Sequence, residues 1–306
     1  MNEIFQTQSL IRNFIKYLPY AIAIAFAGAA FFRWAIYYTV RRHEWFAREF
    51  EKRAHKFLDS EVAKKSLNIS FYNLTKKVLE KTYYEVFAVR DRSNHGDNQK
   101  VMGMNDRIFL IKPGCAWMVK DVLKQLRYLK WSKETPKLLH ITKSSLDQNP
   151  CFNKVFGLFP ISALNDLISM LPGLFIITGI LGTFLGIKGG LISLGGMDMS
   201  DLEGTKTIMD SFLHEIGYAM SSSIVGIAFS LMLHLVNVTF SPERVFSSLC
   251  DRFENTMDLL WYRSDNNDVV ETNRFDENRD PVEALAEEAL NLEISKSEKM
   301  MTLKAS

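Results

Sequence analysis

The sequence predicts an all-α membrane protein, with three transmembrane helices that extend into the cytoplasm and a helical cytoplasmic insert. Three long apolar segments stand out from a chain whose mean hydropathy is only −0.05. Each reaches the roughly 20 mostly apolar residues that cross a bilayer as a helix. The first two segments lie far apart in the 306-residue sequence, and apolar residues recur at helical spacing in the insert between them.

Composition and missing motifs exclude several classes of protein. Lys and Arg total 37 against 35 acidic residues, for a formal charge of +2, so no excess of positive charge attracts nucleic acid and we expect no direct contact with it. The sequence lacks a Gly-Lys-Ser/Thr phosphate loop, an HExxH zinc motif and a GxSxG nucleophile elbow. We therefore predict that the chain is not an enzyme and holds no metal or organic cofactor.

The first predicted transmembrane helix covers residues 17–40 and follows a short segment, 1–16, on the outer side. Its only charge is Arg33. Because Trp and Tyr side chains beside this arginine favour the lipid headgroups, we expect its guanidinium to reach the membrane surface. A cleaved signal peptide ending near Gly28 is the alternative, and the aromatic and basic residues that follow argue against it.

The second and third predicted transmembrane helices cover residues 171–194 and 216–240, joined by a link at 195–215. Lys188 is the only charge in the second helix, and the third contains no Asp, Glu, Lys or Arg. Lys and Arg cluster directly after the first helix, whereas acidic residues dominate the link. Because cations accumulate on the cytoplasmic side, we expect the amino terminus and the link outside, and the insert at 41–170 and the carboxyl terminus inside.

Helices are predicted through most of the cytoplasmic parts. In the insert, apolar spacing indicates helices from Trp45 to Phe57, from Phe71 to Phe87 and from Ala116 to Trp131, separated by a polar loop at 91–103 and a short apolar run at 108–111 that favours a strand.

A further cytoplasmic helix is predicted at 241–262, because Ser241-Pro242 resembles an N-cap followed by proline at the first helical position. From Ser264 to Ser306 there are 11 acidic and five basic residues, so we expect 263–306 to be an acidic, mostly disordered tail. A capping pattern at Asp280 predicts one helix there, with two readings: a helix that docks a partner or a solvated tail.

Small and polar residues gather on one face of each of the last two transmembrane helices, at 100° per residue. These are Pro172, Gly179, Thr183, Gly186 and Gly190 in the second helix, and Ala219, Ser223, Gly226, Ser230, His234 and Asn237 in the third. Two interpretations stay open: the faces line an ion path, since a polar side chain in lipid faces protein or a pore, or they pack closely against each other.

Neither of these helices contains a carboxylate. A hydroxyl can relay a proton but cannot store one at ordinary pH. If the chain conducts protons, a partner must therefore supply the acid. His234 could titrate, but near the cytoplasmic end it fits an exit group or a packing residue.

Residues 172–187, with Leu-Gly-Thr-Phe-Leu-Gly-Ile at 181–187, resemble the second-span signature of the MotA/TolQ/ExbB proton channel family. The order of parts resembles the three-span TolQ and ExbB branch, and the similarity covers about residues 171–237. The same motif also resembles Zorya-type anti-phage motor subunits, which have a longer tail.

The resemblance implies roles for particular residues. Thr183 falls at the family's pore threonine, Pro172 at a proline found at the inner end of this helix in MotA-like members, and Ser223 at a threonine that precedes a glycine by three. Ser222 stands where the family often has alanine. With the small and polar residues of the two helix faces added, the residues predicted to line the proton path are Thr183, Ser223, Ser222, Pro172, Gly179, Gly186, Ser230 and His234.

The resemblance also implies an assembly and a function. A homopentamer would surround two copies of a single-span partner similar to ExbD, TolR or MotB, whose membrane aspartate supplies the missing carboxylate. Such a complex in the bacterial inner membrane, with protons as the coupling ion, would convert the proton motive force into mechanical, rotary work. Envelope transport, motility and phage defence are the possible loads. The alternative from another class is a membrane-anchored scaffold or receptor with a cytoplasmic partner-binding domain and no ion flux.

Overall fold

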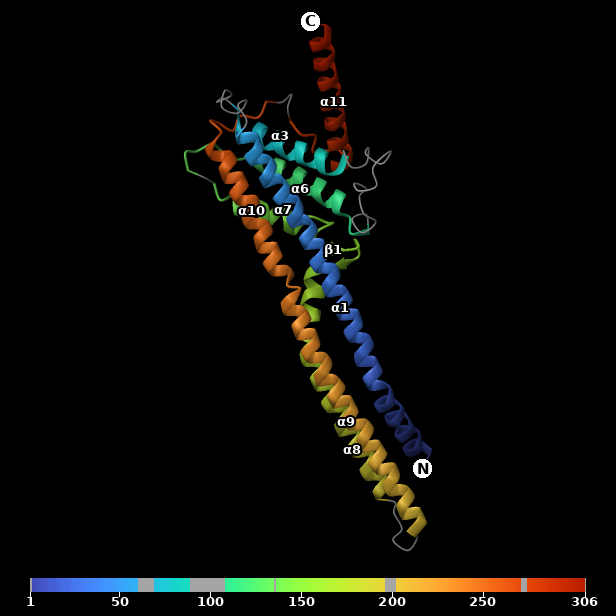
Figure 1. Ribbon diagram of the computed structural model, residues 1–306. Coiled ribbons are helices and arrows are strands. Elements are labelled where there is room, and N and C mark those ends of the chain that lie inside the picture. The colour runs from blue at the N-terminus through green and yellow to red at the C-terminus, as the bar shows by residue number, and fades with distance from the viewer. Residues whose placement is uncertain are drawn as a thin grey trace. The chain divides into compact units, whose positions relative to one another are not determined.

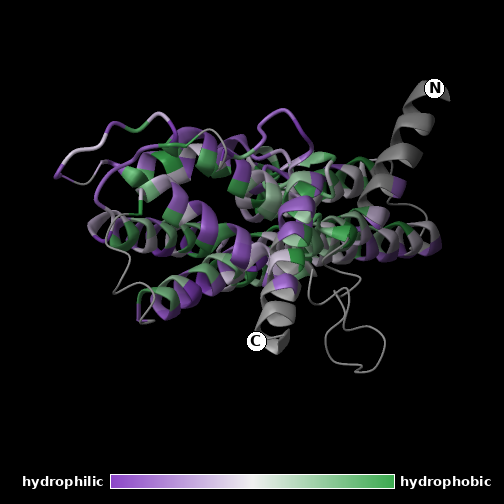
Figure 2. Ribbon diagram, turned by 90° about the horizontal axis from the view of Figure 1, so that it is seen from above, coloured by the Kyte–Doolittle hydropathy of each residue, from purple (hydrophilic) through white to green (hydrophobic). Residues whose placement is uncertain are grey.

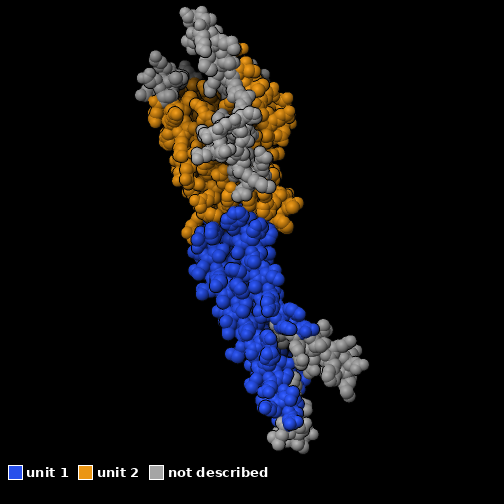
Figure 3. Space-filling view, turned by 45° about the vertical axis from the view of Figure 1, so that its right-hand side comes forward, with its two compact units in different colours: residues 1–35, 162–241 blue, residues 36–161, 242–306 orange. Residues whose placement is uncertain are grey.

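The computed structural model describes residues 2–59, 69–88, 108–134, 136–195, 202–270 and 274–305, and these are mostly helical (Figure 1). The chain forms two compact units (Figure 3). Residues 1–35 and 162–241 make up the first unit, and residues 36–161 and 242–306 make up the second. Each unit is described separately below.

Three helices are long and apolar enough to cross a membrane, which confirms the predicted class of an all-α protein with three candidate membrane spans. They are α1 (Asn2–Asp59), α8 (Ile161–Leu194) and α9 (Leu202–Thr239). All three are longer than the predicted spans. In particular, α9 begins within the predicted outer link, of which residues 196–201 lie outside the described part of the chain.

The first unit is built on a small apolar core between α1, α8 and α9. Its buried members are Leu18, Ile22 and Ala29 of α1, Phe175 of α8 and Leu233 of α9. Many other large apolar side chains of α8 and α9 are exposed, including Phe184 at 69% and Ile224 at 65%. Helices that are apolar all round need a nonpolar environment, so lipid or another protein must cover these faces.

The second unit is a helical domain with one short hairpin. It contains the last turns of α1 together with α3 (Phe71–Tyr83), the π-helix η1 (Tyr84–Ala88), α6 (Ile111–Leu126), α7 (Leu138–Gln148), β1 (Lys154–Val155), β2 (Phe159–Pro160), α10 (Pro242–Tyr262) and α11 (Pro281–Ala305). The strands β1 and β2 pair antiparallel. Hydrophilic and hydrophobic residues are mixed along the helical ribbons of the chain (Figure 2), and helices with one face in a core contain both kinds of residue.

Aromatic side chains fill the core of the second unit. Phe50 of α1 stacks on Phe253 of α10 with 4.9 Å between ring centroids. Trp261 packs edge-on against Phe71, with 4.9 Å between ring centroids, and at a tilt of 31° against Trp131, with 4.4 Å between centroids. The helical patterns predicted for the insert and for 241–262 therefore correspond to helices that meet through their aromatic faces.

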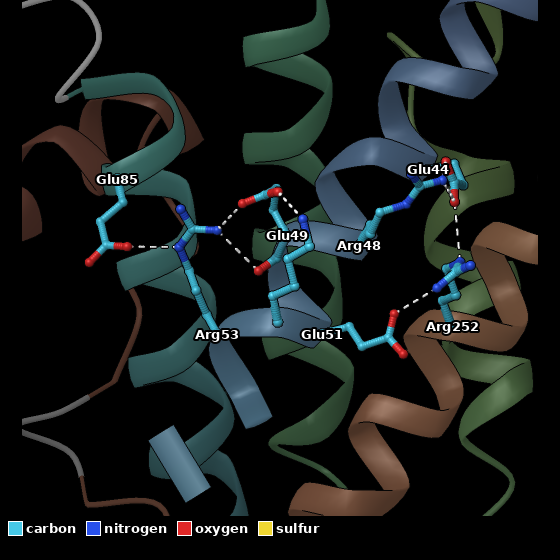
Figure 4. A network of polar contacts seen from close by, with 8 residues as sticks. Glu44, Arg48, Glu49, Glu51, Arg53, Glu85 and Arg252 are labelled. Carbon is cyan, nitrogen blue, oxygen red and sulfur yellow. Dashed lines mark hydrogen bonds and ion pairs between the residues drawn. The ribbon is translucent and has the colours of Figure 1, made fainter. Parts of the chain in front are cut away.

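A network of ion pairs joins α1 to α10 and η1 within this unit (Figure 4). The Arg252 guanidinium of α10 lies 2.8 Å from Glu51 and 3.2 Å from Glu44, both on α1. Arg53 of α1 lies 2.8 Å from Glu85 of η1. Such pairs add little stability when exposed, but they fix the register between helices whose apolar faces already meet.

The apolar run at 108–111 does not form a strand, which corrects that expectation. Leu110 has a left-handed backbone with φ 52°, and α6 begins at Ile111. Ile111 and the helix face that follows it are buried, so the run belongs to the helical core. The polar loop predicted at 91–103 lies outside the described residues.

The segment after Tyr262 differs from the expected disordered tail. Asn267 is buried, and its amide nitrogen donates to the carbonyl oxygens of Leu126 at 2.9 Å and Leu129 at 2.7 Å. Its amide oxygen accepts from the Tyr72 backbone N–H at 3.1 Å. One side chain thus satisfies three backbone groups, which holds this acidic segment against the core.

Helix α11 follows the predicted capping pattern, since Asp280 accepts from the backbone N–H groups of Val282 at 2.9 Å and Glu283 at 3.3 Å. The helix is longer than predicted, and its first turns pack against α3 and α6 of the same chain. Ala284, Leu285 and Ala289 are buried there. This part of the tail therefore docks on its own domain, rather than standing free in solvent.

A buried charge cluster lies where α11 meets α3. The Lys76 ammonium lies 2.8 Å from Glu288 of α11 and 3.4 Å from Glu80. Burial raises the pKa of Glu80 from 4.5 to about 8, with Lys76 opposing the shift and Glu288 adding to it. Because Glu288 favours the protonated form of Glu80, ionisation of Glu80 must in turn disfavour the docked α11.

We predict that docking of α11 weakens as the pH rises. The raised pKa of Glu80 stabilises the docked state fully below its ordinary value of 4.5, and this contribution is lost as the pH passes about 8. After correction for intrinsic rates, hydrogen exchange of α11 amides near Ala284 and Ala289 should speed up by as much as roughly 100-fold between pH 6 and 9, because pH 6 lies about two units below the raised pKa of Glu80. Glu80→Gln should remove this dependence, whereas Glu283→Gln on the exposed face should retain it. A Glu80→Gln profile equal to the parent's would contradict the assignment.

At Gly114, α6 lies so close to α1 that a side chain would not fit. A Cβ there would lie 2.6 Å from His43 Nε2. The imidazole cannot withdraw, because Nδ1 lies 2.8 Å from the Thr39 carbonyl and the ring packs edge-on against Phe152. Because the Thr39 carbonyl oxygen can only accept, Nδ1 carries a proton and donates to it.

Gly114→Ala should therefore destabilise the protein by about 1–3 kcal/mol, as overpacking does. Thermal unfolding of the purified protein in detergent measures this cost. The double variant His43→Ala with Gly114→Ala should lose less than the sum of the two single changes, since the clash is gone. Strict additivity would show that the contact is not the cause.

Candidate functional site

The helices α8 and α9 touch backbone to backbone through small residues. A Cβ on Gly226 of α9 would lie 2.6 Å from the Phe175 carbonyl oxygen of α8. A Cβ on Gly179 of α8 would lie 3.1 Å from both Ser222 O and Ser223 Cα of α9. A Cβ on Gly186 of α8 would collide with the methyl group of Ala219 of α9. Close packing thus accounts for the glycines and the alanine of the two predicted faces.

Ser222 lies at the centre of this contact, although the predicted face of the third span did not include it. Its side chain is fully buried, and its hydroxyl lies 2.7 Å from the Ala219 carbonyl oxygen and 3.3 Å from that of Gly179. The hydroxyl can donate to either carbonyl, one on each helix. A serine at this position therefore adds a polar tie across the contact that alanine could not provide.

Thr183 directly follows Gly182, at which a Cβ would meet Ser222, and the Ser223 Cα lies 3.1 Å from a Cβ placed on Gly179. We therefore place both residues at the edge of the contact, where both are only partly buried. The Thr183 hydroxyl donates to the Ile180 carbonyl oxygen of its own helix at 2.6 Å. Because that bond uses the hydroxyl hydrogen, the oxygen can still accept from a further donor. These two residues, unlike Ser222, are partly exposed in the single chain.

The remaining predicted residues take different positions. Ser230 is buried, Pro172 is half-buried inside α8, and His234 is exposed on α9. The structure therefore brings Gly179, Ser222 and Ser223 together, and leaves His234 outside the helix contact. Its role as an exit group stays a prediction.

Arg33 corrects the expectation that its guanidinium reaches the membrane surface. Its side chain is only 3% exposed. Nη1 donates to Asn165 Oδ1 of α8, and Nη2 donates to the Asn237 carbonyl oxygen of α9 at 3.0 Å. Sequence reasoning missed this cluster because its members are 132 and 204 residues from Arg33.

The first unit holds hydroxyl and amide groups within its apolar helices, but the segments 17–40, 171–194 and 216–240 contain no carboxylate. Among the described residues, no group of three or more His, Cys, Asp or Glu side chains is arranged to bind a metal ion. The side-chain hydroxyls at the α8–α9 contact are those of Ser222, which bonds across it, and of Thr183 and Ser223 at its edge.

No model of a known protein family matches the chain, and no curated protein matches it. The resemblance to proton channels accordingly depends on the motif at 181–187 and the order of the spans.

We predict that Gly226→Ala disrupts the α8–α9 contact, because the new methyl group meets a backbone carbonyl that cannot rotate away. The cost should be about 1–3 kcal/mol, measured as a lower melting temperature in detergent or lipid discs.

Gly217→Ala is the matched control, because it lies in the same helix and has nothing within 4 Å of the new Cβ. It should be neutral or stabilise by up to about 1 kcal/mol. Equal melting temperatures for the two variants would show that α8 and α9 do not meet at Gly226.

Proposed function

We propose that the chain is the proton-conducting subunit of a motor in the bacterial inner membrane, and that it works with a single-span partner that has a carboxylate within the membrane. The observation that supports this most directly is the position of Thr183 and Ser223. Both are partly accessible hydroxyls at the edge of a backbone contact between two candidate membrane helices. The resemblance of 181–187 to the family's pore segment adds support.

The proposed path combines groups from two chains. The partner's carboxylate takes up a proton, and the hydroxyls of Thr183 and Ser223 orient the proton donor and acceptor beside it. The exposed apolar faces of α8 and α9 supply area for a homopentamer around a partner dimer. Each proton that crosses 100 mV releases about 2.3 kcal/mol, so a few protons suffice for one rotational step.

The proposed orientation follows from the charges of the sequence. Cations cluster directly after residue 40, and acidic residues dominate 195–215. With the amino terminus and this link outside, the second unit lies in the cytoplasm. Its aromatic core and ion pairs suit an aqueous compartment.

A scaffold without ion flux is the second candidate, favoured by the folded second unit. This domain has its own core and could bind a cytoplasmic partner while the helices only anchor it. The two candidates differ in one observable, because a scaffold should function when the membrane potential is collapsed.

We predict that Thr183→Val reduces proton uptake by roughly 100-fold or more, the scale of a lost proton-transfer group. Valine keeps the shape of threonine but removes the hydroxyl. Ser223→Ala should act in the same direction, and the double variant should abolish uptake. The measurement is potential-driven proton uptake into vesicles that contain the chain and its partner, scored per complex recovered.

Two control variants accompany this test. Thr183→Ser keeps the hydroxyl and should retain most of the uptake. Lys188→Gln should be mild, because Lys188 is exposed and lies about 140° around the helix from Thr183. If Thr183→Val takes up protons like the parent, the hydroxyl has no role in conduction.

A further inference from the structure

Arg33 is buried among the helices of the first unit. Arg33 is the only charged residue of segment 17–40, and its side chain is 3% exposed within the first unit. Ionisable groups at membrane depth are costly and mark functional positions. The question is what its hydrogen bonds to Asn165 and Asn237 hold in place.

Both partners of Arg33 belong to the helices that form the candidate proton path. Asn165 lies in the second turn of α8, and Asn237 lies in the last turn of α9. The carbonyl end of a helix is the negative end of its dipole, which favours a cation there. A planar guanidinium can donate to two acceptors at fixed angles, so Arg33 ties α1 to both other helices.

The side chain of Asn237 makes a further hydrogen bond, to the part of α8 that Pro172 interrupts. Pro172 has no backbone N–H, so the Ile168 carbonyl, four residues earlier, loses its helical donor. The Asn237 side-chain amide donates to that Ile168 oxygen at 3.3 Å. Ile168 is buried, and a buried carbonyl oxygen with no donor would be costly. Asn237 therefore repairs the break that Pro172 makes in α8.

We propose that Arg33, Asn165 and Asn237 form a polar clamp that fixes the direction of α8 on either side of the Ile168–Pro172 turn and thereby positions Thr183 for proton transfer. This inference rests on the proposed function. Thr183 lies about 16 Å beyond Pro172 at 1.5 Å per residue, so a change of about 10° in the direction of α8 at this turn would move its hydroxyl by roughly 3 Å. That displacement exceeds the tolerance of a hydrogen bond.

The clamp itself is tested by a double-mutant cycle that needs no ion flux. Pro172→Ala restores a backbone N–H for Ile168 O, so Asn237→Leu should matter less in that background than in the parent. The coupling should amount to roughly 2–4 °C in melting temperature in lipid discs. Asn237 Oδ1 is buried and accepts no hydrogen bond among the described residues, so the single change also removes a buried acceptor. The readout is therefore the coupling between the two changes.

Thr239→Leu is the matched control, because Thr239 is exposed on the same turn of α9. It should combine additively with Pro172→Ala. If Asn237→Leu has the same effect in both backgrounds, Asn237 does not repair the proline break and the clamp is overturned.

The positioning role is tested by proton uptake per recovered complex. Arg33→Met and Asn237→Leu should each reduce uptake by roughly tenfold or more, the scale of a misplaced reacting group. Arg33→Lys keeps the positive charge but loses the planar guanidinium that donates to two acceptors. Its proton uptake should therefore lie between that of Arg33→Met and that of the parent. Adding Asn237→Leu to Pro172→Ala should reduce uptake no further.

The two hypotheses fail in different ways. If the cycle shows coupling while uptake per complex is unchanged in Arg33→Met and Asn237→Leu, the clamp is structural only and the positioning role is overturned. If the parent complex takes up no protons, the proposed function is overturned along with the positioning role, and the cycle still decides whether the clamp exists.

Discussion

The contact between the backbones of α8 and α9 is the constraint on which the first unit depends. In an environment without water, helices gain little from burying apolar surface and must meet through close packing and polar ties. Gly179 and Gly226 allow that approach, and Ser222 adds a hydroxyl across it. Because the contact is so close, only residues at its edge stay accessible. Thr183 and Ser223 are there, which gives the proposed proton path its position.

The two units solve different physical problems. The first exposes large apolar side chains along α8 and α9, which only lipid or protein can cover. The second buries aromatic residues such as Phe50, Phe253 and Trp261 in its core, and ion pairs such as Arg252–Glu51 and Lys76–Glu288 join its helices. In the second unit, buried polar groups such as Asn267 pair with backbone groups. In the first, Asn237 serves the same purpose where Pro172 interrupts α8.

The sequence predicted most of the helices, because helix formation depends on neighbouring residues. It did not predict which side chains meet at the candidate site, because these contacts join residues far apart in the sequence. The apolar runs and Ser241-Pro242 predicted helices. Helical periodicity also indicated the small-residue faces, but a sector of a helix does not define the line of contact, so Ser222 was assigned to neither face. The Arg33 cluster could not be predicted, since its partners are 132 and 204 residues away. Disorder was predicted for the tail because an acidic composition is typical of disordered segments. Composition does not reveal the hydrogen bonds by which Asn267 holds this segment to the core.

Cryo-microscopy of the chain in lipid discs, purified together with any co-assembled membrane protein, tests the central claim most directly. The account predicts a ring of copies around single-span helices, with a partner carboxylate at the level of Thr183 and Ser223. The Arg33 clamp should be present in each copy. A chain whose Thr183 face meets only lipid, with no single-span helix beside it, would contradict the proposed proton path.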